Sequence, residues 1–189
     1  MATFFVSDTH FGHQRIIELC NRPFSSVEEM NEVMIERWNA VVKPTDKVYH
    51  MGDVALGKIA DSLPLIGRLN GTKILIPGNH DRIFSGVKQS QRERFFPEYM
   101  KVFDFIAAEL SSVWIDSRMA IMSHFPYAGD SHDEDRYSEK RPPDRGFPLI
   151  HGHVHEKWKH NGRMFNVGVD VNNFTPVSED EIVDWLNTL

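Results

Sequence analysis

The stretch Thr3-Phe4-Phe5-Val6-Ser7-Asp8-Thr9-His10 sets the pattern on which the rest of the chain is built. Its apolar, β-branched and aromatic residues 3–7 predict a buried strand, which ends at a carboxylate followed by an imidazole. Residues i and i+2 of an extended segment point to the same side, so Asp8 and His10 can reach one ion or two neighbouring ions together. This strand therefore predicts a sheet whose edge carries ligands.

Outward from this strand, the first eighty residues alternate between strand and helix patterns. Residues 47–51 and 72–76 predict a second and a third strand. Residues 27–42 and 59–69 predict helices, the first opened by a Ser–Glu capping box and carrying apolar residues three or four positions apart. This alternation predicts an α/β fold with a parallel sheet and right-handed crossovers.

The second half of the chain predicts shorter strands, turns and a closing helix. We expect strands over 102–115, 118–122 and 149–150, a turn at 116–117, a hairpin over 158–165 and a helix over 178–186. Between them, residues 126–148 carry ten charged residues and four prolines without periodicity. Such a loop is either a functional lid that contacts phosphate or a mobile, solvated segment, and both interpretations stay open.

The composition is typical of one soluble domain over residues 1–189. The chain has 21 Lys+Arg and 27 Asp+Glu, a net charge of −6, with 41% hydrophobic and 25% charged residues, which excludes disordered and coiled-coil classes. The single Cys20 excludes an intramolecular disulfide and a Cys-rich zinc site. No apolar run approaches the roughly 20 residues of a membrane span, so we expect a cytoplasmic protein with no membrane partner.

Metal-binding residue types follow five of the expected strands. The motifs are Asp8-Thr9-His10, Gly52-Asp53, Gly78-Asn79-His80-Asp81, Ser123-His124 and Gly152-His153-Val154-His155. Open α/β sheets bind ligands at the carboxyl ends of their strands, which is where these motifs lie. Imidazole and carboxylate together suit Mn, Fe, Zn, Ni or Co.

The ordered set of five motifs resembles the calcineurin-like metallophosphoesterase family, and residues 7–13 are similar to compact members from bacteria and phages. The resemblance implies a four-layer αββα sandwich of two mixed sheets. It also implies two divalent metal ions, with Mn²⁺ favoured and Fe, Zn, Ni or Co possible. The implied ligands are Asp8, His10, Asp53 and His155 for the first ion, and Asp53, Asn79, His124 and His153 for the second.

By the same resemblance, we expect hydrolysis of a phosphate ester through a hydroxide held between the two ions. His80 resembles the residue that contacts phosphate and protonates the leaving alkoxide, and Asp81 is expected to orient His80, with a helix N-cap as its alternative. The expected substrate is a small phosphodiester such as a cyclic nucleotide. A nuclease, a phosphomonoesterase or a protein phosphatase is the alternative, and a non-catalytic scaffold is disfavoured because every motif position is filled.

Other candidates have two interpretations each. His13, Arg15 and Asn79 are candidate substrate contacts, although His13 suits a surface role and Arg15 a solvated helix turn equally or better. His50 and His151 are expected to point away from the ions, and Asp170 is expected to be a structural turn residue rather than a support of the site. A nuclease would need a basic groove with aromatic side chains, and residues 92–96 offer one candidate. Nucleic acid is possible but not favoured by the acidic balance, and the oligomeric state is left open.

Overall fold

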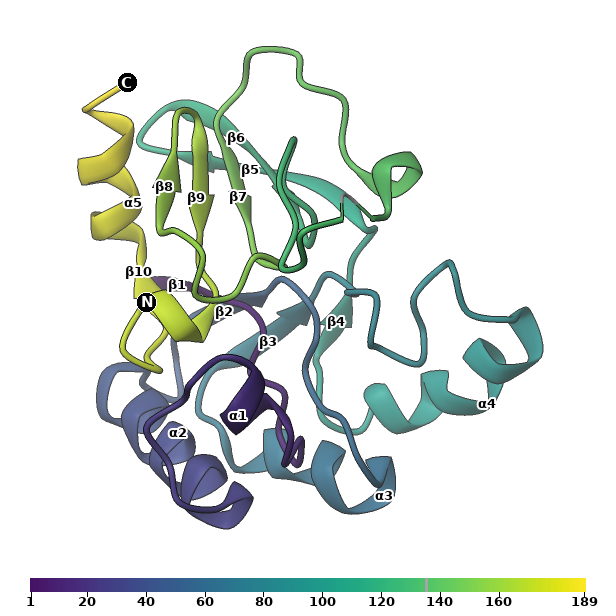
Figure 1. Cartoon of the computed structure of the whole chain (residues 1–189). Helices are drawn as coiled ribbons and strands as arrows, with labels where there is room; N and C mark the ends of the chain where they lie inside the picture. Colours follow the sequence, from purple (N-terminus) through teal and green to yellow (C-terminus); the bar gives the residue numbers. More distant parts are fainter. Residues whose placement is uncertain (135) are drawn as a thin grey trace.

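Two five-stranded mixed sheets lie face to face in the described part of the chain (Figure 1). The computed structural model describes residues 1–134 and 136–189. The first sheet has the order β10-β1-β2-β3-β4 and consists of β1 (Thr3–Val6), β2 (Lys47–His50), β3 (Thr72–Leu75), β4 (Phe105–Ile106) and β10 (Val177–Ser178). Strands β1 to β4 run parallel and β10 pairs antiparallel with β1. The predicted parallel sheet is thereby confirmed.

The second sheet has the order β5-β6-β7-β9-β8. It consists of β5 (Leu110–Ile115), β6 (Arg118–Ser123), β7 (Leu149–His151), β8 (His160–Asn161) and β9 (Met164–Asn166). Strands β5 and β6 form an antiparallel hairpin around Asp116 and Ser117, both of which adopt the left-handed backbone that such a tight turn requires. Strands β6, β7 and β9 are parallel. Strand β8 pairs antiparallel with β9, which follows it in the chain, and the two strands form the predicted hairpin.

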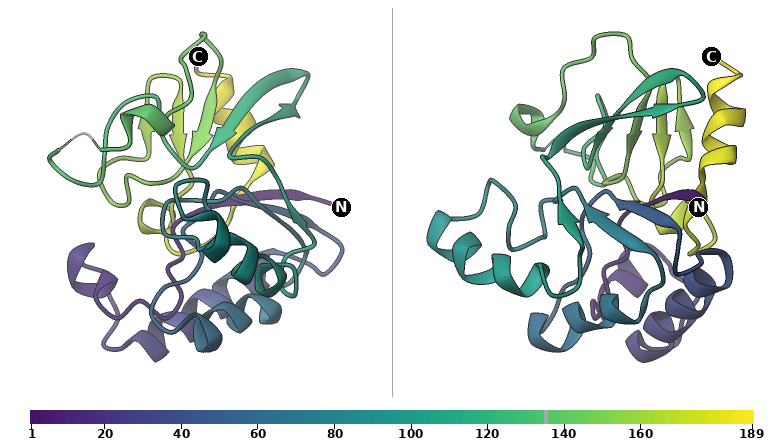
Figure 2. Two further views of the ribbon diagram at one scale, coloured as in Figure 1. Left: turned by 90° about the vertical axis from the view of Figure 1, so that its right-hand side faces the viewer. Right: turned by 180° about the vertical axis from the view of Figure 1, so that it is seen from behind.

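Most helices cover the outer face of the first sheet (Figures 1 and 2). They are α1 (Ile16–Leu19), α2 (Val27–Val41), α3 (Ile59–Ser62) with the 3₁₀ helix η1 (Leu63–Arg68), and α4 (Gln89–Tyr99). Helix α5 (Glu179–Leu186) closes the space between the two sheets. The remaining elements, η2 (Ser138–Lys140) and η3 (Val169–Val171), are short 3₁₀ turns. The Ser26 hydroxyl caps α2 and Ser178 caps α5, as the capping boxes predict.

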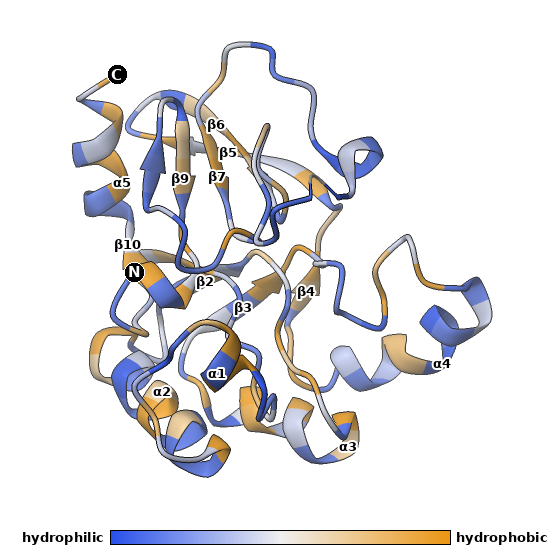
Figure 3. Ribbon diagram, in the orientation of Figure 1, coloured by the Kyte–Doolittle hydropathy of each residue, from blue (hydrophilic) through white to orange (hydrophobic). Residues whose placement is uncertain are grey.

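Side-chain alternation along β1 separates two cores. Phe4 and Val6 point to the helices, where they join α2 residues such as Met34 and Trp38. Phe5 points the other way and packs with second-sheet residues such as Phe165. Figure 3 shows hydrophobic residues on the strands and inward helix faces, whereas the loop after β6 is largely hydrophilic. In the described residues, no helix is both long and apolar enough to cross a lipid bilayer.

Several elements differ from the prediction, and the short strand β10, for example, was not predicted. The expected strand over 102–115 is two strands, because the chain leaves the first sheet at Ala107 and joins the second at Leu110. The expected helix over 59–69 continues as a 3₁₀ helix from Leu63, with Pro64 in its first turn, where its missing N–H costs least. Helix α4 was not predicted, because it is polar and contains Pro97, a residue that normally ends helices.

Candidate metal centre

The residues after five strands meet where the two sheets come together. Strands β1, β2 and β3 deliver Asp8, Asp53 and Asn79, while β6 and β7 deliver His124 and the pair His153 and His155. Five of the seven predicted metal ligands have left-handed backbone: Asp8 (φ 58°), His10 (φ 50°), Asp53 (φ 56°), His153 (φ 72°) and His155 (φ 48°). Non-glycine residues rarely adopt this conformation, and its clustering at one place is typical of a functional site.

Two glycines allow the strand ends to approach one another. A Cβ atom on Gly152 would overlap the side chains of Ser7 and Asp8, and one on Gly78 would overlap the Asp53 carboxylate. The motif glycines are therefore required by close contact between loops, in addition to any turn they form.

The first half of the site holds buried polar atoms that lack partners. Asp8 Oδ1, Asp53 Oδ2 and both ring nitrogens of His10 are buried and have no hydrogen-bond partner among the described residues. His10 Nε2 lies 4.0 Å from Asp8 Oδ1 and 3.7 Å from Asp53 Oδ2, and His155 Nε2 lies 3.9 Å from Asp8 Oδ1. Two ligand atoms about 2.1 Å from one cation lie roughly 3–4.2 Å apart, depending on the angle between them, so these separations suit a cation.

The protonation state of His10 also fits a metal ligand. Burial, together with the nearby His155 and Arg22, lowers the pKa of His10 well below its ordinary value. The imidazole is therefore neutral, which is the form that binds metals. A neutral buried ring with neither nitrogen hydrogen-bonded is costly unless a cation takes one lone pair.

The second half of the site faces the same Asp53 oxygen. His124 Nδ1 donates to the Met51 carbonyl (2.7 Å), so in the neutral ring Nε2 carries a lone pair. That Nε2 lies 3.0 Å from Asn79 Oδ1 and 3.5 Å from Asp53 Oδ2. Burial alone would lower the pKa of His124, but the charges of Asp53 and Asp8 outweigh it and raise the pKa, so this place favours positive charge and these residues also fit a cation. Asp53 Oδ2 is common to both halves.

His80 lies at the opening of the site. Its backbone N–H donates to Asp53 Oδ1 (2.8 Å), and its Nε2 is 3.9 Å from Asp53 Oδ2. Its side chain is 48% exposed, in contrast to the buried imidazole of His10. The ring can therefore meet both the metal site and a ligand that enters from solvent.

Asp81 does not orient His80, contrary to our prediction. Its buried carboxylate accepts hydrogen bonds from the backbone N–H groups of Asp53 (2.9 Å), Val54 (3.1 Å) and Gly78 (2.8 Å), and lies 3.3 Å from the Tyr99 hydroxyl. Burial, together with the charge of Asp53, raises the pKa of Asp81 to about 7. Asp81 therefore ties the two loops that carry Asp53 and Asn79 to each other.

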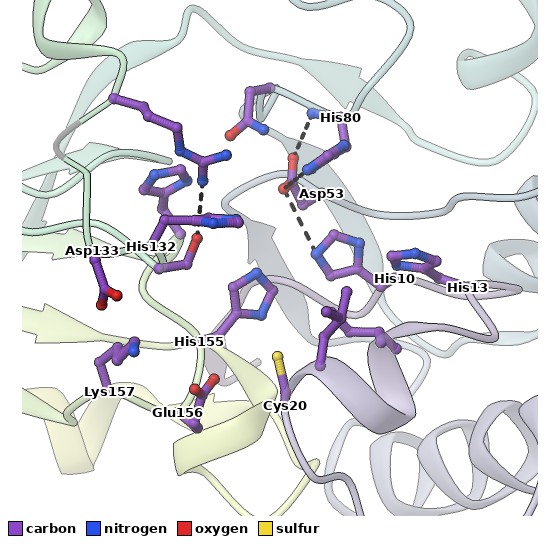
Figure 4. A pocket seen from close by; sticks show the side chains of 16 residues that line it. His10, His13, Cys20, Asp53, His80, His132, Asp133, His155, Glu156 and Lys157 are labelled. Carbon is purple, nitrogen blue, oxygen red and sulfur yellow. Dashed lines mark hydrogen bonds and ion pairs between the residues drawn. The ribbon is translucent and has the colours of Figure 1, made fainter.

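A cavity of about 420 Å³ opens above these residues (Figure 4). One wall is α1 with the preceding turn and includes His13, Ile16, Leu19 and Cys20, and the opposite wall includes Ser131, His132, Asp133, Arg136, Glu156 and Lys157. Part of the loop 126–148 therefore borders the site. This position is compatible both with a lid that contacts phosphate and with a solvated segment. Arg15 is exposed at the start of α1 and is outside the described lining of this cavity.

The remaining candidates lie away from the cavity or behind the ligands. His50 and His151 are buried, and their rings bind Thr9 Oγ1 (3.0 Å) and the Gly152 carbonyl (2.7 Å). The candidate nucleic-acid groove at residues 92–96 belongs to α4, where Phe95 packs against the helix-side core. That segment is outside the described lining of the cavity.

Each histidine of the 153–155 motif is held by a carboxylate and a guanidinium. His155 Nδ1 lies 3.2 Å from Asp170 Oδ2, and Asp170 accepts from Arg22 (2.8 Å); we call Asp170 and Arg22 the inner support. His153 Nε2 lies 3.1 Å from Asp130 Oδ2, and Asp130 accepts from Arg136 (2.9 Å); we call Asp130 and Arg136 the loop support.

Sequence reasoning did not identify three of these four supporting residues. Arg22 lies in an irregular segment, and Asp130 and Arg136 lie in a loop without periodicity, so no local pattern marks them. Asp170 was expected to be a turn residue. It does belong to the short turn η3, but its buried side chain contacts His155, so it supports the site.

Two mixed sheets with carboxylates and imidazoles gathered at their shared edge define a hydrolase of the metal-dependent phosphoesterase class. The family model described as calcineurin-like phosphoesterase matches residues 1–187, and the chain belongs to this family. The predicted family and the predicted phosphoester hydrolase activity are therefore confirmed.

The relatives of this chain match it over nearly its whole length. The gene 66 protein of Mycobacterium phage L5 is 34% identical over 98% of this chain and 94% of that protein. An uncharacterized protein of Methanocaldococcus jannaschii is 33% identical over 95% of this chain and 88% of that protein. The crystal structure of an Aquifex aeolicus protein of unknown function is similar with a TM-score of 0.75 and 28% identity, covering 97% of this chain and 98% of that one.

Proposed function

We propose that this protein is a binuclear metal-dependent phosphodiesterase that acts on small phosphodiesters such as cyclic nucleotides. The observation that carries the proposal is the buried Asp53 Oδ2, which has no hydrogen-bond partner among residues 1–134 and 136–189 and lies within 4 Å of ring nitrogens from both His10 and His124. A carboxylate in this position suits a bridge between two cations. The proposed ligands are those of the two sets predicted from the resemblance, Asp8, His10, Asp53 and His155, and Asp53, Asn79, His124 and His153.

Two divalent ions, when bound, would supply Lewis acidity toward phosphoryl oxygens and a hydroxide nucleophile at neutral pH. Mn²⁺ is the favoured ion, and Fe, Zn, Ni and Co also suit imidazole and carboxylate donors. Asp8 and Asp53 are the buried negative charges that would retain these ions.

His80 is the proposed acid. Its half-exposed ring projects at the opening of the cavity, so its Nε2 can donate a proton to the alkoxide oxygen that leaves phosphorus. The backbone N–H of His80 donates to Asp53 Oδ1, and this hydrogen bond fixes the backbone that carries the ring beside the proposed metal bridge.

The cavity walls suit a small organic phosphodiester. The volume of about 420 Å³ falls in the ordinary range for small-molecule sites. Ile16 and Leu19 give one wall an apolar surface for an organic group, while the other wall offers the cations Arg136 and Lys157 to an anion, beside the acidic Asp133 and Glu156. His13 lines the cavity beside α1 and is a proposed substrate contact.

The test is a substrate series after chelation and reloading with Mn²⁺. We expect turnover of bis-p-nitrophenyl phosphate and of a nucleoside cyclic phosphate, abolished by chelator and restored by Mn²⁺. Turnover of monoesters alone would make the protein a phosphatase, and steeply salt-dependent cleavage of oligonucleotides would make it a nuclease. A protein that binds no divalent ion would overturn the proposal.

The role of His80 is tested separately. His80→Ala should retain two Mn²⁺ ions per chain but lose roughly 10²–10⁴-fold in turnover, the usual contribution of a positioned acid. His160→Ala, which removes an exposed imidazole on β8, is the matched control and should behave as wild type. Full activity of His80→Ala would contradict the assigned role.

A further inference from the structure

Asp130 is a buried carboxylate in an otherwise polar loop. Its side chain is only 2% exposed, whereas the following residues His132, Asp133 and Glu134 are exposed. Burying a carboxylate is unfavourable unless hydrogen bonds and positive charge compensate. The contacts of the Asp130 carboxylate must therefore compensate for the hydration that it loses on burial.

The contacts of Asp130 join two parts of the molecule. From the loop, the Arg136 guanidinium (2.9 Å) and the backbone N–H of His132 (3.0 Å) donate to Oδ1, and the backbone N–H of Arg136 (3.1 Å) donates to Oδ2. From the strand end after β7, His153 Nε2 lies 3.1 Å from Oδ2. Asp130 thus links the loop to His153, a proposed metal ligand.

The contact determines which nitrogen of His153 carries the ring proton. An imidazole that binds a metal is neutral and carries one ring proton. An acceptor at Nε2 requires that proton on Nε2, which leaves the Nδ1 lone pair available to a cation. Carboxylates commonly fix metal-binding histidines in this way.

We propose that Asp130 is a positioning residue that couples metal binding at His153 to docking of the loop wall of the cavity. The inference rests on the proposed metal site. A cation on Nδ1 makes the Nε2–H group a stronger donor, which strengthens its bond to Asp130, and a docked Asp130 in turn selects the metal-binding tautomer. By linkage, each event favours the other to the same extent.

The docked loop also supplies side chains to the wall of the cavity. Ser131, His132, Asp133 and Arg136 line the cavity opposite α1, and Arg136 is held by Asp130 directly. The Phe125 and Tyr137 rings lie 4.8 and 5.8 Å from the His153 ring, so aromatic packing accompanies the docked arrangement. Formation of the metal site therefore also favours the docked wall that would contact an anionic substrate.

Asp130→Asn tests the coupling against Asp144→Asn as matched control. Asp144 lies in the same loop, but its half-exposed carboxylate pairs with Arg163 instead. Mn²⁺ binding is measured by isothermal titration calorimetry, and exchange of the amides of residues 130–134 is measured by hydrogen–deuterium exchange with and without Mn²⁺. In wild type and Asp144→Asn, we expect two ions and at least a several-fold slowing of exchange when Mn²⁺ is added.

In Asp130→Asn, we expect one ion to bind about tenfold to a hundredfold more weakly and the Mn²⁺-dependent slowing to disappear. Asp130→Glu, which keeps the charge on a longer side chain, should restore part of both. Wild-type affinity for both ions in Asp130→Asn, equal weakening of both ions, or slowing that persists would each overturn the coupling while leaving the proposed function intact. Absence of Mn²⁺ binding to wild type would overturn both.

Discussion

The two supports do the same task for neighbouring histidines but are built from different parts of the chain. In the inner support, the Arg22 side chain is fully buried and bonds both oxygens of Asp170, 148 positions away, as well as the carbonyl oxygens of Asp8 and Thr9. In the loop support, Arg136 is 37% exposed and its partner Asp130 is only six positions away.

Because of this difference, we expect the inner support to affect mainly folding and the loop support to affect mainly function. The inner support joins distant segments and can form only when the whole fold is present, so losing it should weaken the fold itself. The loop support is formed within one loop and its guanidinium is partly exposed, so it can detach at a cost far below that of global unfolding. His155 is therefore held by residues whose contact depends on the whole fold, and His153 by a contact that the loop completes.

The largest effect is expected from Arg22→Met. This change leaves the Asp170 carboxylate and two backbone carbonyls buried without their donor, which typically costs about 3–5 kcal/mol. Urea denaturation of the metal-free protein measures the free energy of unfolding. Arg68→Met is the control, because Arg68 makes two hydrogen bonds with Glu32 (2.6 and 2.7 Å) at an exposed position, where we expect a loss of at most about 1 kcal/mol. Equal losses in the two variants would remove the distinction between buried and exposed pairs.

A smaller effect is expected from Asp170→Asn, which keeps the shape of the side chain but removes the charge that balances Arg22. We expect a loss of about 2–3 kcal/mol in the free energy of unfolding, against a smaller loss for Asp130→Asn in the metal-free protein, because the loop can open locally without unfolding the rest of the chain. A loss in Asp130→Asn as large as that in Asp170→Asn would show that the loop is part of the folding core.

The pH dependence of the unfolding free energy of wild type and Asp170→Asn tests the role of the Asp170 charge. Burial alone would raise the pKa of Asp170, but Arg22 and His155 outweigh it and hold the pKa below the ordinary value of 3.8. A carboxyl whose pKa is lowered on folding stabilises the protein above its unfolded pKa, and this contribution is lost as the pH falls. The difference in unfolding free energy between wild type and Asp170→Asn should therefore be full near pH 6 and shrink below pH 4. A difference that stays constant over this range would contradict the role of the charge.

The same contrast explains how much of the site could be predicted from sequence. Asp8, Asp53 and the 153–155 motif were identifiable because each directly follows a strand, and a strand is a local pattern. Arg22 and Asp170 were not, because their contact depends on packing between segments 148 positions apart. Asp81 was misassigned for a related reason: it follows His80 in sequence, but folding turns its carboxylate to the backbone of the loop that carries Asp53.

The fold shows the same division. The parallel strands β1, β2 and β3 and the capped helices α2 and α5 were predicted from periodicity and caps. The change of sheet between β4 and β5 was missed, since residues 102–115 form one extended pattern in sequence, and only pairing to Leu75 on one side and Ser123 on the other divides it.

The smallest effect on stability is expected from Arg136→Gln, although it should act clearly on the loop. Because the guanidinium is partly exposed, its loss should change the free energy of unfolding of the metal-free protein by no more than about 1 kcal/mol. It should nevertheless reduce the Mn²⁺-dependent slowing of amide exchange at residues 130–134, since Asp130 then keeps His153 but loses its strongest donor within the loop. Arg145→Gln, an exposed arginine of the same loop, is the control and should leave both measurements unchanged. If Arg136→Gln destabilised the protein as much as Arg22→Met, the loop support would be as much a part of the fold as the inner one, and His153 would not differ from His155 in the way the structure indicates.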